Sequence, residues 1–205
     1  MKDFLFREPL KELDPELSEL IGHETKRQQR KLVMVPSESI APPAVNQAVG
    51  SSFSNIYAEG YPSERTRRMT EEEILDYEEM LGHYRRFSDP RYYKGVEYAD
   101  VLEALARRRT AQVFANGLSP DEIYVNVQAL SGAPANTAVQ YALMDPGDTM
   151  MSLSLYVGGH LSHGSKVAYS GKTYNAAHYG VDPQTEQLDY DTIREQALEV
   201  KPKLI

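Results

Sequence analysis

The stretch from Tyr124 to Leu143, YVNVQALSGAPANTAVQYAL, constrains the fold more than any other part of the chain. Residues 123–128 alternate apolar and polar side chains with a period of two, which predicts a strand. Residues 135–143 carry apolar side chains at helical spacing, which predicts a helix. The turn Ser131-Gly132-Ala133-Pro134 joins the two, so we expect a strand, a tight turn and a helix in succession.

The turn suits an anion because it leads into the N-terminus of a helix. Gly132 lets the backbone approach a ligand closely, and Pro134 fits a first helical turn, where no N–H is needed. Free N–H groups and the positive end of the helix dipole favour a phosphate at such a place. An ordinary strand-to-helix turn has the same local sequence, so this stretch alone leaves both interpretations open.

Composition indicates a soluble globular protein and argues against several kinds of site and partner. The chain has 205 residues, of which 41% are hydrophobic and 25% charged. Because the net charge is −8, no nucleic-acid partner is predicted. The absence of cysteine excludes disulfides and a cysteine nucleophile, and it is compatible with the cytoplasmic location that we predict. No apolar run has membrane-spanning length, so no membrane partner is predicted.

The N-terminal part, residues 1–45, is predicted to be an arm followed by an amphipathic helix. Asp14 and Pro15 are residue types preferred at an N-cap and at the first helical position, so the helix begins there. An apolar stripe along it requires a packing partner in this chain or another. Residues 46–205 are predicted to be the first part of a larger domain, and another helix is expected at Pro43–Val49, across that boundary.

Two polar loops in the first third of the chain are candidate ligand-facing segments. Ser37-Glu38-Ser39 follows a short apolar run that a proline ends. Residues 54–62, SNIYAEGYP, place Glu59 among aromatic side chains, where a carboxylate can serve as a general acid or base. Both segments also fit ordinary solvated loops, and the local sequence alone favours that interpretation.

Residues 63–90 are a charged segment in which we predict one amphipathic helix. Thr70 and Glu73 have the spacing of a capping box, and apolar residues follow at helical spacing: Ile74, Tyr77, Leu81 and Tyr84. A basic aromatic loop, Arg91-Tyr92-Tyr93-Lys94-Gly95, comes next. A second helix is predicted from Glu97 to Phe114, with four inward residues: Val101, Leu102, Leu105 and Val113.

The last third of the chain alternates between predicted strands and helices. Strands are expected at three places: Thr149–Leu153, Lys166–Ser170 and Ala176–Tyr179. Asp189 is expected to cap a helix, and residues 203–205 begin another apolar run. This alternation indicates an α/β fold with a largely parallel sheet. Because the chain stops as a strand begins, we expect the sheet to be incomplete and the sequence to be truncated.

The glycine-rich stretch Leu155–Gly164, LYVGGHLSHG, contains two histidines. His160 and His163 are three residues apart, which is a spacing that metal sites use. No acidic residue or cysteine is near them in the sequence, so no metal site is predicted.

Seven stretches of this chain together resemble serine hydroxymethyltransferase, a pyridoxal-phosphate enzyme of the aspartate-aminotransferase fold. They are VPSES (35–39), NIYAEGYP (55–62), RYYKGVEYAD (91–100), VNVQALSGAPAN (125–136), DPGDTM (145–150), GGHLSHG (158–164) and SGKTYN (170–175). They occur in the family's order and spacing, apart from an insertion at 63–90, and the resemblance covers residues 15–205. It implies a truncated fold type I large domain, a mostly parallel sheet with flanking helices.

The resemblance also implies a cofactor site for pyridoxal 5'-phosphate. Ser131, Gly132 and Ala133 would hold the cofactor phosphate at the helix N-terminus. His160 would stack on the pyridine ring. Tyr57 would reach the phosphate from the neighbouring subunit, so a homodimer or higher homo-oligomer is implied.

The implied reaction transfers the serine hydroxymethyl carbon to tetrahydrofolate, giving glycine and methylenetetrahydrofolate. Glu59 would handle a proton beside the hydroxymethyl group, Tyr93 would lie near the substrate Cα and carboxylate, and Ser37 would lie near the substrate. Catalytic roles are therefore implied for Glu59, Tyr93 and His160. Folate contacts are implied for Leu155, Gly159, His160 and Leu161.

The sequence departs from the family pattern at several positions. Ala133 stands where the family often has Ser, Ser39 where Asn is usual, and Val157 where His is common. The family's Schiff-base lysine, pyridinium aspartate and carboxylate-binding arginine would follow Ile205. None of four lysines in the last third matches the lysine motif: Lys166, Lys172, Lys201 and Lys203.

Two hypotheses from different classes follow from these observations. The chain is the N-terminal portion of a serine hydroxymethyltransferase and is inactive alone, or it is a non-catalytic polypeptide that binds a phosphate ligand or a partner subunit. A threonine aldolase is disfavoured by the YAEGYP and GGHLSHG motifs. The reading frame after codon 205 distinguishes the two hypotheses, because only the first requires a following lysine motif.

Overall fold

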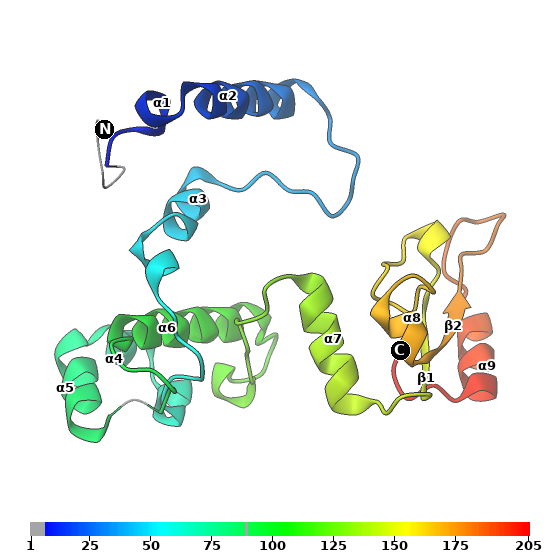
Figure 1. Ribbon diagram of the computed structural model, residues 1–205. Helices are drawn as coiled ribbons and strands as arrows, with labels where there is room; N and C mark the ends of the chain where they lie inside the picture. The colour runs from blue at the N-terminus through cyan, green and yellow to red at the C-terminus, as the bar shows by residue number, and fades with distance from the viewer. Residues whose placement is uncertain (1–6, 89) are drawn as a thin grey trace. The chain divides into compact units, whose positions relative to one another are not determined.

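A computed structural model describes residues 7–88 and 90–205 of the chain (Figure 1). The chain divides into two compact units, residues 1–57 and 58–205, and each is described by itself. The domain boundary predicted after residue 45 stays a prediction, because compactness does not test the family's domain organisation. The start of the predicted arm, residues 1–6, lies outside the described residues.

The first unit consists of short and medium helices joined by extended segments. The predicted capping of its long helix is confirmed, since the Asp14 carboxylate accepts from Leu17 N at 2.9 Å and Pro15 occupies the first turn. The helix predicted at Pro43–Val49 is also present. The elements are α1 (Leu10–Leu13), α2 (Pro15–Arg30), α3 (Pro43–Val49) and the 3₁₀ turn η1 (Ser52–Asn55).

The second unit begins with a group of helices around one long helix. The elements are η2 (Glu64–Arg68), α4 (Glu71–Leu75), α5 (Tyr77–Phe87), α6 (Glu97–Phe114) and η3 (Pro120–Glu122). The capping box is confirmed, with Glu73 N bound to Thr70 Oγ1 at 3.2 Å and Thr70 N bound to the Glu73 carboxylate at 2.7 Å. The prediction of a single helix was wrong. Asp76 ends α4 and caps α5, because its carboxylate accepts from Glu79 N at 3.0 Å.

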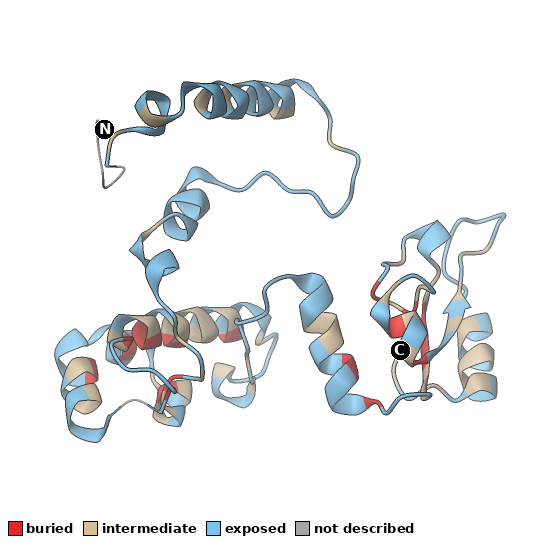
Figure 2. Cartoon of the chain, viewed as in Figure 1, coloured by how far each residue is buried: buried red, intermediate tan, exposed pale blue. Residues whose placement is uncertain are grey.

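Helix α6 packs its inner face against α4 and α5, and Figure 2 shows the buried residues along it. Ile74, Met80, Val101 and Ala104 form this core, with Met69 and Leu105 partly buried against it. The inward placement predicted for Leu102 and Val113 was wrong, since they are 46% and 78% exposed. The inward placement of Val101 and Leu105 is confirmed, and Asp100, Ala104 and Ala111 are buried with them at helical spacing.

Residues 123–128 are extended but do not form the predicted strand. A strand needs a neighbour with which to exchange backbone hydrogen bonds. No such neighbour pairs with this segment among the described residues. The alternation appears in the burial of its first half only, because Ile123 and Val125 are partly buried and Tyr124 is 75% exposed, whereas Val127 is 39% exposed.

The rest of the second unit contains α7 (Gly132–Leu143) and a small parallel sheet. Strand β1 (Thr149–Leu153) pairs in parallel with β2 (Asn175–Tyr179), and Met151 lies opposite Ala177. Leu204 adds a parallel bridge to Met150 on β1. Met144, Met150 and Tyr174 form the core here, with Leu204 packed against it. The remaining elements are η4 (Leu155–Val157), α8 (Tyr169–Thr173) and α9 (Tyr190–Val200).

The strand predicted at 166–170 was wrong, because the chain turns there and begins α8. Ser170 is buried, and its hydroxyl accepts from Gly164 N at 3.0 Å, which closes the preceding turn. A Cβ added at Gly171 would lie 2.2 Å from Ser165 O, so the two backbones approach too closely for another residue. The helix that Asp189 was predicted to cap is confirmed as α9, since its carboxylate accepts from Thr192 N.

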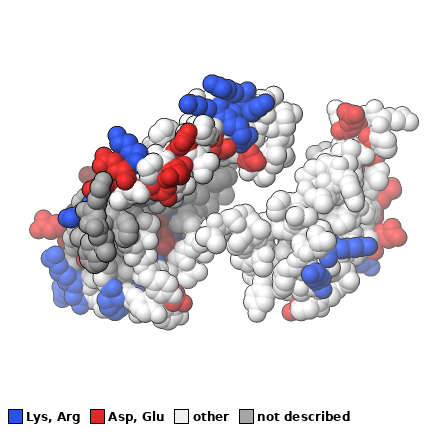
Figure 3. All heavy atoms as spheres, turned by 45° about the horizontal axis from the view of Figure 1, so that its top comes forward, with Lys and Arg blue, Asp and Glu red and all other residues white. Residues whose placement is uncertain are grey.

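Charged side chains of both signs lie on the face shown in Figure 3, as expected for a chain with 22 basic and 30 acidic residues. Among residues 7–88 and 90–205, no helix combines the length and hydropathy that a membrane span requires.

Candidate functional site

The N-terminus of α7 presents backbone donors that no group in residues 7–88 or 90–205 satisfies. Ser131 is the extended N-cap, and its side chain makes no capping bond. The first ladder bond runs from Ala135 N to Ser131 O at 3.1 Å, whereas no described residue accepts from the N–H of Gly132 or Ala133. Both residues are exposed, and a Cβ at Gly132 would meet nothing within 4 Å. These donors and the open space beside them fit a phosphate.

Asn136, on the second turn of α7, links the helix to the glycine-rich loop. Its amide nitrogen donates to Ser162 Oγ at 2.8 Å, and Ser162 Oγ lies 2.8 Å from His160 Nδ1. Ser162 N also donates to His160 Nδ1, at 3.1 Å. Since Nδ1 accepts that bond, the proton of a neutral His160 ring is assigned to Nε2. Gln140, one turn further along α7, donates to Ser162 O at 2.7 Å.

The two glycines before His160 fold the loop back against the end of β1. Gly158 has φ +113°, which favours glycine, and a Cβ at Gly159 would lie 2.0 Å from Leu153 O. Gly159 N donates to Ser154 O at 2.9 Å, and Ser154 N donates to Tyr179 O on β2 at 2.8 Å. The loop that carries His160 is therefore anchored to both strands.

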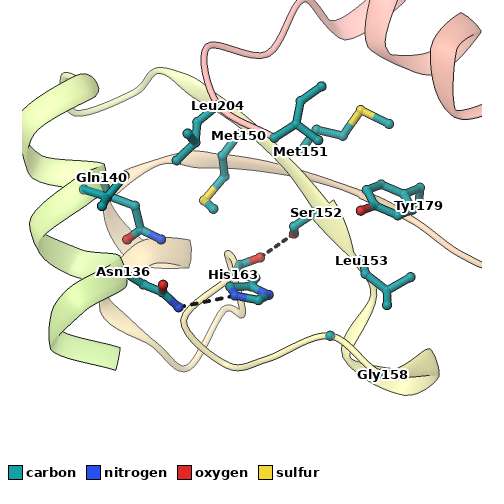
Figure 4. A pocket seen from close by; sticks show the side chains of 13 residues that line it. Asn136, Gln140, Met150, Met151, Ser152, Leu153, Gly158, His163, Tyr179 and Leu204 are labelled. Carbon is teal, nitrogen blue, oxygen red and sulfur yellow. Dashed lines mark hydrogen bonds between the residues drawn. The ribbon is translucent and has the colours of Figure 1, made fainter. Parts of the chain in front are cut away.

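A pocket of about 350 Å³ lies between α7, β1 and this loop (Figure 4). His163 lines it, with Nε2 3.3 Å from the Asn136 amide nitrogen and its carbonyl bound by Ser152 Oγ at 2.6 Å. Burial, and then the neighbouring His160, lower the pKa of His163 below its ordinary value. Gln140 Oε1 also lies buried here, without a partner among the described residues.

Glu59 and Tyr93 lie on two segments that the structure brings together. Tyr92 N donates to Glu59 O at 3.2 Å, which joins the loop at 58–60 to the segment after Arg91. Arg91 is buried and binds the same loop. Glu59 is exposed, and Tyr93 is 49% exposed.

The other predicted site residues are placed as follows. Ser37 and Tyr57 belong to the first unit, where Ser37 lies in a turn closed by Glu38 N and Val35 O at 3.0 Å, and Tyr57 is 68% exposed. Leu155 and Leu161 flank His160 and are 46% and 45% exposed. Their roles in binding cofactor, substrate and folate stay predictions.

Several residues that shape these surroundings were missed from the sequence. Asn136 and Gln140 are polar residues four apart on a helix of mostly small and apolar residues, a pattern that signals a polar contact. Ser162, between the two histidines, gave no such signal. Arg91 was grouped with a basic aromatic loop, and only the structure shows that it is buried against distant partners.

The described residues contain no group of three or more His, Asp or Glu side chains placed to hold a metal ion. The rings of His160 and His163 pack edge to face with centroids 5.6 Å apart. His160 Nδ1 is engaged with Ser162, and the pair serves the loop's internal hydrogen bonding.

The described residues thus combine helices with a two-stranded parallel sheet, and they hold a histidine-bearing loop against a helix whose first backbone donors are open. A sequence model of the serine hydroxymethyltransferase family matches residues 10–89 and 83–205. The chain therefore belongs to the serine hydroxymethyltransferase family.

Individual relatives agree with this assignment. The chain is 44% identical over all 205 residues to serine hydroxymethyltransferase of Kocuria rhizophila, and it covers 41% of that protein. It is 43% identical over 194 residues, 95% of this chain, to the enzyme of Pseudoalteromonas atlantica, and covers 39% of it. It is 43% identical over 198 residues, 97% of this chain, to that of Corynebacterium efficiens, and covers 38% of it. The chain thus spans about two fifths of the length of these relatives.

Proposed function

We propose that the whole protein transfers the hydroxymethyl group of serine to tetrahydrofolate, giving glycine and 5,10-methylenetetrahydrofolate. Family membership supports this reaction class. The same membership supports a fold type I large domain, of which β1, β2 and their flanking helices would be one part. Because the chain covers about 41% of a relative's length, the activity is proposed for the whole protein and not for these residues alone.

The observation that carries the proposal is the free N-terminus of α7 and its link to His160. The N–H groups of Gly132 and Ala133, to which no described residue offers an acceptor, belong to exposed residues, and the helix dipole adds a positive field. The contact between Asn136 and Ser162 places the His160 loop against the same helix. These residues fit pyridoxal 5'-phosphate, with its phosphate at the turn and its ring against His160.

Pyridoxal 5'-phosphate, when bound, supplies the electron withdrawal that the bonds at the substrate Cα require. Ser131 would contribute a hydroxyl to the phosphate, and Gly132 and Ala133 would contribute N–H groups. Ala133 has no hydroxyl, so it would bind the phosphate through its backbone N–H alone. His160 would present a flat ring whose orientation Ser162 fixes through Nδ1. Tyr57 from a neighbouring subunit would complete the phosphate site in a homodimer.

The remaining proposed roles concern the substrate and folate. Glu59 would hold or release a proton at the serine hydroxyl oxygen, as a general acid or base. Tyr93 would contact the substrate near Cα and its carboxylate, and Ser37 would contact the substrate. Folate would lie against the loop residues on either side of His160: Leu155, Gly159 and Leu161.

The first test assays the purified whole protein for folate-dependent cleavage of serine with added pyridoxal 5'-phosphate. We expect methylenetetrahydrofolate to form only when serine, folate and cofactor are all present. Cofactor binding without turnover would overturn the proposal in favour of a non-catalytic binding protein.

A second test addresses the phosphate site itself. Ala133→Asp places a negative charge where the phosphate is proposed to lie, so we expect cofactor affinity to fall at least about tenfold, because like charges in one site repel. Ala138→Asp makes the same change on an exposed position of α7, away from the N-terminus, and is the matched control. Equal cofactor affinity in the two variants would exclude the α7 N-terminus as the phosphate site.

A further inference from the structure

Arg91 joins the loop at 58–60 to α6 through buried hydrogen bonds. Its side chain is 1% exposed. Nη1 donates to Ala58 O at 2.7 Å and to Gly60 O at 2.9 Å. The same guanidinium reaches α6, where Nε donates to Asp100 at 2.5 Å and Nη2 donates to Glu103 at 2.7 Å. One planar group therefore fixes the loop backbone against the helix.

Glu59 lies in the middle of the backbone that is held in this way. Its own carbonyl accepts from Tyr92 N at 3.2 Å, so the pair Arg91-Tyr92 binds three consecutive carbonyls. Gly60 has φ +105°, and a Cβ there would lie 3.0 Å from Arg91 Cα. The close approach therefore favours glycine at this position. These bonds fix the backbone on both sides of Glu59 and its own carbonyl.

The segment that leads to α7 is attached to the same group of residues. Gln128 Nε2 donates to Gly60 O at 2.8 Å and to Glu103 Oε1 at 2.8 Å. Gln128 lies three residues before Ser131, the N-cap of α7. Gly60 and Glu103, which bind Arg91, therefore also bind the segment that leads to the N-terminus of α7.

The hydrogen bonds made at position 91 suit an arginine side chain and not a lysine side chain. Burial opposes the charge of Arg91, but hydrogen bonds to Asp100 and Glu103 outweigh it and raise the pKa of Arg91, so the group stays charged. A guanidinium holds five donors in one plane, whereas a lysine ammonium is a compact point charge. Lysine at position 91 would keep the charge but would not serve two carbonyls and two carboxylates in these directions.

We propose that Arg91 is a positioning residue that sets the location of the Glu59 carboxylate. This inference rests on the proposed function, in which Glu59 handles a proton at the substrate. Because a displacement of about 1 Å near the reacting atoms can cost on the order of 10²-fold in rate, we expect Arg91→Lys to lower kcat roughly 10- to 100-fold. The KM for serine is expected to change little, since the Arg91 side chain is 1% exposed and is enclosed by the loop and α6.

The matched control is Arg109→Lys, the same substitution on α6, the helix to which Arg91 binds. Arg109 pairs with Glu71 at 3.1 Å on the surface, where its side chain is 59% exposed. We expect this variant to keep normal kcat. Equal losses in Arg91→Lys and Arg109→Lys would overturn the inference, because the effect would then not depend on the loop.

A double-mutant cycle separates positioning from general stabilisation. If Arg91 acts through Glu59, then Arg91→Lys adds less than about twofold to the loss already caused by Glu59→Gln, because coupled residues are not additive. If the loss of kcat in the double variant equals the product of the two single losses, the inference is overturned, whereas the proposed role of Glu59 is unaffected. Should Arg91→Lys fail to fold, Gln128→Ala takes its place in the cycle, since it removes a bond to Gly60 from an exposed residue.

Amide hydrogen exchange of the cofactor-free whole protein gives a readout independent of activity. We expect Arg91→Lys to accelerate exchange in residues 58–61 and at Tyr92, and to leave α9 unchanged. Unaltered exchange in the loop would overturn the inference. If the unsubstituted protein shows no serine cleavage at all, the proposed function fails, and the exchange data still decide whether Arg91 holds the loop.

Discussion

The side-chain amide of Asn136 donates to the hydroxyl of Ser162 across 2.8 Å, and this contact connects α7 to the loop that carries His160. Asn136 is partly buried and Ser162 is 8% exposed, so water does not readily replace either partner. The contact matters for function because α7 carries the proposed phosphate donors and the loop carries His160, the proposed contact to the cofactor ring. This contact, together with the bond from Gln140 to Ser162 O, therefore helps to set their relative placement.

Asn136→Ala is expected to weaken the retention of pyridoxal 5'-phosphate by the whole protein. The substitution removes the donor to Ser162 Oγ, which itself contacts the His160 ring, and leaves Gln140 as the other α7 residue bound to Ser162. A hydrogen bond of this type contributes about 1 kcal/mol, so we expect a loss of roughly 5- to 10-fold in cofactor affinity. The affinity is measured by titrating the cofactor-free protein with pyridoxal 5'-phosphate and following the absorbance.

Asn46→Ala is the control for this prediction, because Asn46 is an exposed asparagine on α3. It is expected to leave cofactor affinity unchanged. Normal affinity in Asn136→Ala would show that the contact between α7 and the loop does not support the site.

His163 is expected to make stability depend on pH. Burial and the neighbouring His160 lower its pKa in the folded chain below the ordinary value of 6.5. The unfolded chain therefore binds the proton more readily, and stability is lost as pH falls below 6.5. A neutral ring can accept at one nitrogen, either from Asn136 at Nε2 or from His160 N at Nδ1, whereas a doubly protonated ring can accept at neither.

The measurement is the thermal midpoint of the whole protein between neutral and mildly acidic pH. His163→Gln removes the titrating group, so its midpoint is expected to fall less steeply with acid. His83 has a pKa lowered by burial and then by Arg65, and it remains in both proteins as a common background. Identical slopes for the two proteins would contradict the assigned role of His163.

The charged segment 63–90 is expected to support α6. Ile74 is 0% exposed and packs with Met80 against Val101 and Ala104. Ile74→Ala is expected to cost about 2–5 kcal/mol in the free energy of unfolding, because it leaves a cavity in that core. Leu75→Ala, at a neighbouring residue that is 37% exposed, is expected to cost at most about 1 kcal/mol. Urea-induced unfolding measures the loss of free energy in each variant. Equal losses for Ile74→Ala and Leu75→Ala would contradict a shared core between this segment and α6.

Local signals in the sequence predicted local structure well. The caps at Asp14, Thr70 and Asp189 were readable because a cap depends on residues three apart. Asp76 carried the same signal within a predicted helix, and the apolar periodicity concealed it. The strands at β1 and β2 were readable from short apolar runs bounded by turns.

Long-range relationships were not readable in this way. Residues 123–128 have the composition of a strand, yet a ladder also needs a neighbouring strand, which a local pattern cannot specify. Arg91 binds the carbonyls of Ala58 and Gly60, which lie more than 30 positions away in the chain. The residues next to Arg91 in the sequence do not predict these hydrogen bonds. The resemblance to the family identified Glu59, whereas only the structure shows what holds its loop.

Glu59→Gln is expected to impair catalysis much more than folding. The substitution keeps the size of the side chain and its ability to form hydrogen bonds, but it removes the proton that the proposed role requires. General acid–base catalysis is typically worth ~10²–10⁴ in rate, so we expect folate-dependent serine cleavage by the whole protein to fall by that factor. Steady-state kinetics measure this loss.

Little change is expected in the thermal midpoint or the cofactor absorbance of Glu59→Gln. The side chain is exposed in the loop at 58–60, and the loop is held through its backbone carbonyls by Arg91 and Tyr92. Near-normal turnover would show that Glu59 is not the proton-handling group. Collapse of the fold would instead make Glu59 a structural loop residue, because backbone hydrogen bonds alone would then have proved insufficient to hold the loop.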